Sequence, residues 1–231
     1  LHPLPAAVPR QPCPLSMSTV FNFTFVPWFR AVAPYIHMHR GKTFVVGVVG
    51  EAIAAGQLGN IATDLALIQS MGVKIVLVHG FRPQVNEQLQ AKGHEPRYAQ
   101  GMRITDEVAL DCAQEAAGQL RYEIEAAFSQ GLPNTPMAGS RVRVISGNFL
   151  TARPMGIIDG VDFRHTGVVR KVDAAGIRHS LDSGALVLIS PFGFSPTGEA
   201  FNLRMEEVAT SVAIALQADK LLFLTEVPGI R

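Results

Sequence analysis

Two continuous apolar runs constrain the fold of this chain more than any other feature. Residues 43–50 (TFVVGVVG) and 73–80 (VKIVLVHG) have the length of strands and lack the polar alternation of a strand with one wet face. Residues 185–190 (ALVLIS) and 220–227 (KLLFLTEV) have the same character. Strands buried on both faces are typical of a parallel sheet that helices cover on both sides. We therefore predict an α/β fold, a three-layer sandwich with a mainly parallel central sheet.

Helices are expected between these strands. Residues 58–71 put apolar side chains on one helical face, and Gly72 then supplies a common helix stop. Thr105 is expected to cap a long helix, because acidic residues at 106 and 107 suit its first turn. The predicted order is β-α-β-α-α-β-hairpin-α-β-α-β. Its remaining parts are helices at 83–92, from Asp173 to about 183 and at 204–218, and a strand and hairpin within 141–155.

The chain is expected to have three parts. Residues 1–16 are rich in proline and lack the apolar core of a signal peptide, so we interpret them as a disordered leader or an artefact of start-site assignment before Met17. A targeting peptide is the alternative. Residues 17–40 are predicted to form an N-terminal helix segment that Pro34 should bend or interrupt. Residues 41–231 form the main domain, expected to be incomplete at its C-terminal end because no covering helix follows the last strand.

Composition excludes several classes of function. The formal net charge is +1 and the basic residues are scattered, which fits neither a nucleic-acid partner nor an anionic membrane surface. The longest apolar runs are too short for a membrane span. Cys13 and Cys112 are far apart, and the seven histidines show no metal-ligand spacing, so we expect neither a disulfide framework nor a metal site. A reducing cytoplasm is the expected compartment.

Candidate ligand-binding turns follow the predicted strands. In an open parallel sheet, ligands bind where the carboxyl ends of the strands meet, and the turns 47–51, 78–83 and 224–229 lie there. None of them is a GxxxxGK[ST] phosphate loop or a GxGxxG fingerprint, and a glycine after a strand more often serves only the turn. His79 ends a strand with no carboxylate partner in view, so we interpret it as a structural residue.

Several long segments together resemble a known family. They are PYIHMHRGKTFVVGVVGEAI from residue 34, VLVHGFRPQVNEQL from 76, GMRITDEVALDCAQEAAGQL from 101 and TGEAFNLRMEEVATSVAIALQADKLLFLTEVPGI from 197. In this order they resemble the amino-acid-kinase family, and within it the N-acetylglutamate kinases and N-acetylglutamate synthases. The resemblance covers nearly everything after Phe25 and implies an amino-acid-kinase-like (carbamate-kinase-like) fold.

The kinase pattern of that family is broken in three places. Family kinases carry a lysine in a K-x-G-G run of the first strand, where this chain has Gly47 and Val49 in the run GVVG. Their second strand ends in three glycines, where this chain has Gly80-Phe81-Arg82, and their N-x-N-x-D run is NLRME at 202–206. Phosphoryl transfer depends on positive charge at the transferring group, so loss of that lysine argues against kinase activity.

The losses resemble the kinase-like domain of bacterial-type N-acetylglutamate synthases. In that family this domain binds L-arginine as a feedback inhibitor. A separate C-terminal domain, absent from this chain, is an acyltransferase that moves the acetyl group of acetyl-CoA to L-glutamate in arginine biosynthesis. The resemblance therefore implies a regulatory part of an amino-acid N-acetyltransferase, hexameric in relatives, with no catalytic residue, metal or cofactor of its own.

The resemblance also implies site residues. Arg103 matches an arginine that holds a substrate carboxylate in the kinases, and with Asn202 and Gly80 it is assigned to a substrate site or a vestigial ligand site. Tyr35 and Lys220 match residues near the arginine effector. The alternatives are an exposed arginine, a partly buried interface tyrosine and a solvated lysine.

Two other functions stay open. One is a working N-acetylglutamate kinase with unusual loops, and the other is a stand-alone, non-enzymatic arginine-binding module. An ATP-dependent assay on N-acetylglutamate separates the first from the synthase interpretation. An acetyltransferase coding region downstream of residue 231 would exclude the second.

Overall fold

The computed structural model of the protein describes residues 25–130 and 142–226. The chain divides into two compact units, Leu1–Met38 and His39–Arg231. The predicted leader, Cys13, the proposed start at Met17 and the end of the last predicted turn lie outside the described residues. None of the described helices is both long and apolar enough to cross a membrane.

The first unit contributes helix α1, Phe25–His39, whose last residue belongs to the second unit. The helix was predicted, with Pro34 expected to bend or interrupt it; the helix continues through that residue without interruption. Trp28 and Tyr35 are among its exposed large side chains, at 59% and 63%.

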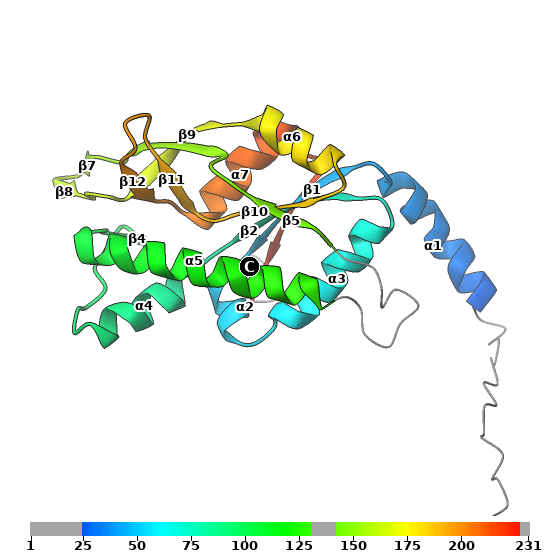
Figure 1. Ribbon diagram of the computed structural model, residues 1–231, viewed down its shortest axis with the longest axis horizontal. Coiled ribbons are helices and arrows are strands. Elements are labelled where there is room, and N and C mark those ends of the chain that lie inside the picture. The colour runs from blue at the N-terminus through cyan, green and yellow to red at the C-terminus, as the bar shows by residue number, and fades with distance from the viewer. Residues whose placement is uncertain (1–24, 131–141, 227–231) are drawn as a thin grey trace, which may run out of the picture. The chain divides into compact units, whose positions relative to one another are not determined.

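A five-stranded sheet lies at the centre of the second unit (Figure 1). Its order is β13-β1-β2-β10-β5, and every neighbouring pair is parallel, as the buried apolar runs predicted. All its strands therefore end at the same edge. The strands are β1 (Thr43–Val48), β2 (Lys74–His79), β5 (Val144–Ser146), β10 (Leu186–Ile189) and β13 (Lys220–Leu224).

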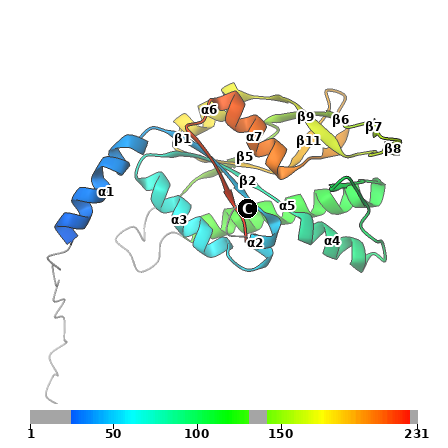
Figure 2. The same cartoon turned by 180° about the vertical axis from the view of Figure 1, so that it is seen from behind.

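Successive side chains of the central strands point into two separate cores. Ile75 and Leu77 pack on one side and Val76 and Val78 on the other, each almost fully buried. The first core includes α2 (Gly50–Ala54), α3 (Leu58–Ser70), α4 (Arg82–Ala91) and α5 (Glu107–Ser129), and the second includes α6 (Ala174–Asp182) and α7 (Met205–Leu216). Figure 2 shows these helix groups on opposite faces of the sheet. The α/β class and the three-layer arrangement are confirmed.

A second, four-stranded sheet has the order β12-β11-β6-β9. Its strands are β6 (Leu150–Pro154), β9 (Gly167–Val172), β11 (Phe192–Phe194) and β12 (Ala200–Asn202), and two short hairpins add β3 (Tyr98–Ala99) with β4 (Met102–Arg103) and β7 (Ile157–Ile158) with β8 (Val161–Asp162). The predicted pairing of strand and hairpin within residues 141–155 is wrong, because β5 pairs with β10 and β6 pairs with β9. Both partners lie far along the chain, where local pattern gives no signal.

The start of α5 also differs from the prediction. Asp106, not Thr105, is the N-cap, and its carboxylate accepts a hydrogen bond from the Ala109 N–H at 2.9 Å. Thr105 is instead fully buried, and its backbone forms an isolated parallel β-bridge with Arg164. At α6 the predicted cap is confirmed, since Asp173 accepts from the Gly176 N–H at 3.0 Å.

Candidate functional site: a pocket at the carboxyl edge of the sheet

A pocket of about 150 Å³ lies where β1, β2 and β10 end. The turns after these strands lead into its walls, as expected for a ligand site of a parallel sheet. Three helices, α2, α4 and α7, begin at its lining residues, so that their partly positive N-terminal ends lie at the pocket. The lining residues are Val49–Glu51, Gly80–Arg82, Tyr98, Gly101–Arg103, Thr166, Pro191 and Asn202–Glu206.

Two glycines bring the ends of β1 and β2 together beneath this pocket. The Gly80 N–H donates to the Val48 carbonyl at 2.7 Å. A Cβ on Gly80 would lie 2.8 Å from the Gly50 nitrogen, and a Cβ on Gly50 would lie 2.8 Å from Pro83 Cδ. Real Cβ atoms do not come so close, so both glycines are required by the crossing of the two turns, whatever the pocket binds.

Arg103 supplies a buried cation to the pocket. Only 9% of the residue is exposed. Its Nη2 donates to Asn86 Oδ1 at 2.6 Å, and its guanidinium lies 5.0 Å from the ring of Tyr98, whose hydroxyl donates to the same Asn86 oxygen at 2.9 Å. The other nitrogen, Nη1, is buried and has no partner among the described residues. A buried donor without a partner is costly, and an anion bound in the pocket would satisfy it.

The charge state of Arg103 follows from this burial. Loss of water lowers the pKa of the guanidinium, and the positive charge of Arg82 adds to this effect. The Arg82 guanidinium lies 5.3 Å from the Tyr98 ring as well. Arginine nevertheless stays protonated in proteins. The wall formed by Arg82, Tyr98 and Arg103 is therefore cationic.

A buried hydroxyl network anchors the backbone of Arg103. Thr166 Oγ1 donates to the Arg103 carbonyl at 2.6 Å and lies 2.8 Å from Thr105 Oγ1. Asn202 Nδ2 donates to Thr105 Oγ1 at 3.1 Å. Asn202 is thus a lining residue that also connects β12 to the start of α5.

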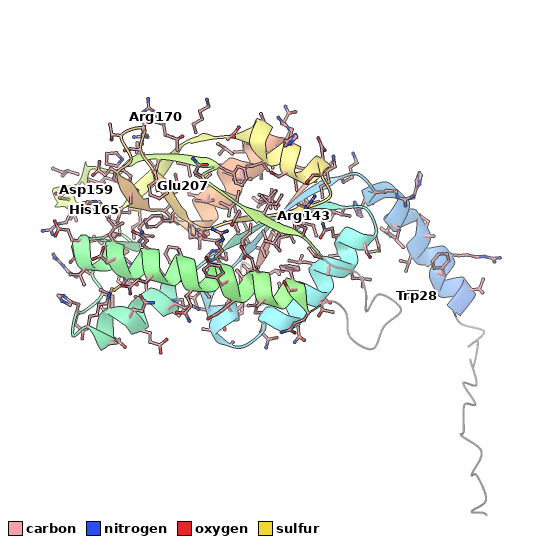
Figure 3. The ribbon with its side chains drawn as sticks, in the orientation of Figure 1. Trp28, Arg143, Asp159, His165, Arg170 and Glu207 are labelled. Carbon is pink, nitrogen blue, oxygen red and sulfur yellow. The ribbon has the colours of Figure 1, made fainter. Side chains whose placement is uncertain are left out.

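Two negatively charged residues of the pocket lie at the beginnings of helices. Glu51 lies in the first turn of α2 and Glu206 in the first turn of α7. Both residues line the pocket, as does Arg204. Within the described part of the chain, no hydrogen bond or ion pair is formed by the side chains of these three residues. Glu207, labelled in Figure 3, is different, because its Oε1 accepts from the Val169 N–H at 2.9 Å and it does not line the pocket.

His79 lies beside the pocket as a neutral structural residue. It is fully buried, its Nε2 lies 2.7 Å from Ser190 Oγ, and its Nδ1 lies 3.4 Å from the Gly80 carbonyl. Burial lowers the pKa of this imidazole to about 4. No group of three or more potential metal ligands occurs among residues 25–130 and 142–226.

Gly47, which the resemblance puts at the kinase lysine position, lies inside β1 with no room for a side chain. A Cβ there would lie 2.7 Å from a ring carbon of Phe223 and 2.9 Å from the Met205 sulfur. Both neighbouring side chains would have to move before any larger residue could fit. The position of a Cβ at residue 47 is therefore already taken by apolar side chains.

The structure brings together three of the five site residues named from the sequence. Gly80, Arg103 and Asn202 all line the pocket. Lys220 does not, because it begins β13 at the amino edge of the sheet, where its Nζ lies 5.9 Å from the Phe44 ring. Tyr35 lies on α1, in the other unit.

Sequence reasoning gave no role to several lining residues. Glu51 lies in the turn 47–51, which was named as a candidate ligand-binding turn, but the residue itself was not assigned to a site. Tyr98 comes from a short hairpin and Thr166 directly precedes β9, and neither was named from the sequence.

Comparison with known proteins shows which family has this architecture. Residues 42–231 match the amino acid kinase family. The amino-acid acetyltransferase of Ralstonia nicotianae is 62% identical over 206 residues, 89% of this chain and 46% of that protein. The amino-acid acetyltransferase of Azotobacter vinelandii is 52% identical, with 89% and 48% covered. The chain spans about half the length of the curated relatives it matches.

Solved structures agree with these matches. N-acetylglutamate synthase from Neisseria gonorrhoeae, complexed with coenzyme A and L-arginine, superposes with a TM-score of 0.84 at 43% identity, over 90% of this chain and 49% of that one. Giardia carbamate kinase has a TM-score of 0.55 at 18% identity and supports the fold alone, over 81% of this chain and 74% of that one.

Proposed function

The chain belongs to the amino acid kinase family, and we propose that it is the regulatory, arginine-sensing part of an N-acetylglutamate synthase that has lost kinase chemistry. Support comes from amino-acid acetyltransferases more than 50% identical over most of this chain. The whole enzyme would transfer the acetyl group of acetyl-CoA to L-glutamate. The sequence spans about half the length of those relatives, and the acetyl-transfer step would lie in the part of the enzyme outside it.

The packing around Gly47 carries the claim that kinase chemistry is lost. Phosphoryl transfer needs a cation at the transferring group, and the position that the family fills with lysine holds no side chain and is closed by Phe223 and Met205. Phe81 and Arg82 also line the pocket where the family's glycines would let a phosphate approach the backbone. A pocket of about 150 Å³ is small for a nucleotide.

The regulatory role is supported by the synthase from Neisseria gonorrhoeae, which was solved with L-arginine and coenzyme A. In this chain we assign Tyr35 and Lys220 to the arginine effector site. Lys220 lies away from the pocket, because it begins β13 at the opposite edge of the sheet. We assign Gly80, Arg103 and Asn202 to a retained ligand pocket. We further propose that residues 41–231 form the kinase-like domain of a cytoplasmic, hexameric protein.

Two measurements on the 231-residue chain test this function. A coupled assay with ATP and N-acetylglutamate should show no phosphorylation above background. A melting scan should show that L-arginine, but not D-arginine, raises the midpoint, because a ligand of the native state stabilises it by mass action. Lys220→Ala should reduce the arginine effect, whereas Lys171→Ala on β9 should not. Kinase turnover, or an arginine effect insensitive to Lys220, contradicts the proposal.

A further inference from the structure

Two small hairpins lead into the walls of the pocket, and each is a two-stranded sheet of its own. The β3–β4 hairpin carries Tyr98, Met102 and Arg103, which line the pocket. The β7–β8 hairpin leads through buried Phe163 to Thr166, another lining residue. An isolated two-stranded hairpin is at best marginally stable, so contacts outside their own ladders must hold both hairpins in place.

One side-chain contact joins the tips of the two hairpins. Gln100 Nε2 donates to Asp159 Oδ2 at 2.6 Å, and this is the one hydrogen bond between residues 97–104 and 156–164 in the described structure. Figure 3 labels Asp159. Both side chains are exposed and could bind water instead. The contact is therefore not required by burial, and its short length reflects how the two tips are placed.

The backbone at both tips is in the left-handed region. Gln100 has a φ of 51° and Asp159 a φ of 47°, and each is followed by a left-handed glycine in a two-residue turn. Aspartate before glycine is a favoured pair in such turns and glutamine is not, so the Gln100 conformation costs free energy that the bond to Asp159 offsets. Strained residues of this kind often mark segments that switch between two conformations.

We propose that Gln100 and Asp159 form a latch that joins the two hairpins into one unit. Release of this latch lets the β3–β4 hairpin move away from α4 and exposes the guanidinium of Arg103. The proposal concerns access to the pocket and not the identity of its ligand. It therefore stands independently of the synthase assignment, and its test needs no ligand.

The other contacts of the β3–β4 tip are weak enough for such a movement. On the α4 side, Tyr98 Oη donates to Asn86 Oδ1 at 2.9 Å, and Arg82 Nη2 donates to the Gly101 carbonyl at 3.3 Å. Both are single side-chain hydrogen bonds at exposed positions. Since hydrogen bonds exposed to water contribute little net free energy, loss of the latch should change the balance between closed and open hairpins measurably.

The base of the β3–β4 hairpin is held more firmly than its tip. The Thr166 hydroxyl donates to the Arg103 carbonyl at 2.6 Å within a buried network. The guanidinium of Arg103 lies between the Tyr98 ring, at 5.0 Å, and Asn86 of α4, and only 9% of the residue is exposed. A hairpin fixed at its base turns about that base, and movement of its tip away from α4 uncovers the guanidinium.

Hydrogen exchange measured by mass spectrometry on the 231-residue chain tests the latch. Gln100→Asn shortens the donor side chain but places the favoured Asn-Gly pair in the turn. Asp159→Gly removes the acceptor and keeps a residue that adopts left-handed backbone. Each variant should speed exchange in peptides covering both hairpins by about three- to tenfold, the effect of one hydrogen bond on an equilibrium. Without a latch, Gln100→Asn should slow exchange, because it improves the turn.

The double variant and a matched control make the test specific. Gln100→Asn with Asp159→Gly should exchange no faster than the faster single variant, since both changes remove the same contact. Gln119→Ala is the control, because Gln119 Nε2 donates to the Glu123 carboxylate at 2.8 Å on exposed α5 surface. This change removes a bond between the same kinds of group and should leave exchange in the hairpins unchanged.

Access to Arg103 is measured separately, by its rate of modification with phenylglyoxal. Peptide mass spectrometry compares Arg103 with Arg121 of α5, whose side chain is 45% exposed and serves as the internal reference. Both single latch variants should raise the Arg103 rate by about the same factor as the exchange rate and leave the Arg121 rate unchanged.

Several results would overturn the latch. They are unchanged or slower hairpin exchange in the Gln100→Asn chain, additive effects in the double variant, an unchanged rate at Arg103, or an equal loss of protection in the central strands, which would mean that the contact stabilises the whole fold. None of these results bears on kinase turnover or on the effect of arginine, so failure of the latch and failure of the proposed function are distinguishable.

Discussion

The crossing of the two turns beneath the pocket makes Gly80→Ala a sharp test of the structure. The added Cβ would lie 2.8 Å from the Gly50 nitrogen and 3.5 Å from the Val48 oxygen and the Val49 carbonyl carbon. All three are backbone atoms, held by the sheet on both sides of the turn, so no side-chain rotation can relieve the contact. Overpacking of this kind costs about 1–3 kcal/mol.

Part of that cost is offset in the unfolded chain. Replacing glycine by alanine reduces unfolded-state entropy and stabilises by about 0.4–1 kcal/mol where the native backbone allows it. The central values, about 2 less about 0.7, leave a net loss of about 1.3 kcal/mol for Gly80→Ala, or roughly 3–5 °C in the melting midpoint for a protein of this size. Differential scanning calorimetry of the chain measures it directly.

Gly59→Ala is the matched control for this change. Gly59 lies in α3, and a Cβ there meets nothing within 4 Å. Alanine is the better helix former by about 1 kcal/mol, so this variant should melt higher than the parent. If Gly80→Ala melts at or above the parent midpoint, the close approach of the two turns is refuted.

Three further predictions concern polar side chains with defined hydrogen-bond partners. Burial lowers the pKa of His79 to about 4 from an unfolded value near 6.5. The free energy of unfolding should therefore fall by on the order of 3 kcal/mol as the pH drops from 6.5 towards 4, because only the unfolded chain takes up the proton. Urea unfolding across that pH range measures this loss, and His79→Gln should flatten the profile. Asp106→Ala should cost about 1 kcal/mol in thermal unfolding through loss of the α5 cap, whereas Asp64→Ala, within α3, should have little effect. Thr166→Val should cost about 1–3 kcal/mol, since it leaves the Arg103 carbonyl without its hydroxyl donor, and Thr210→Val on exposed α7 surface is the comparison.

Each of the three can fail on its own terms. A flat pH profile in the parent chain would mean that His79 is hydrated. An unchanged melting midpoint for Asp106→Ala would mean that the Asp106 carboxylate does not stabilise the start of α5. Equal losses for Thr166→Val and Thr210→Val would mean that the buried network contributes nothing specific.

The central sheet could be predicted from sequence because its strands are buried on both faces. Runs such as 43–50 and 73–80 have only one low-energy environment, between two layers of helices, so local composition decides their place. The second sheet offered no such signal. Strands such as β6 alternate in burial and pair with partners far along the chain, so their register depends on the tertiary fold.

The pocket was partly predictable for a related reason. Gly80 and Asn202 could be proposed because family motifs mark them, and Arg103 because its motif GMRIT is intact. What the motifs could not reveal is the unpaired Nη1, which depends on how Asn86, Tyr98 and Thr166 surround the guanidinium. Those contacts join four segments of the chain that have no common sequence pattern.

The surroundings of Gly47 and of Arg103 differ in what they indicate about kinase chemistry. At Gly47 the kinase lysine is absent, and the Phe223 and Met205 side chains lie where its Cβ would be, so a lysine there would have to displace them. At Arg103 the opposite holds, because a buried cation with an open donor is destabilising unless something binds it. A pocket kept only by descent would gain stability by losing this arginine. Its presence with a buried and unpartnered Nη1 is therefore better explained by a ligand that the chain still binds than by descent alone.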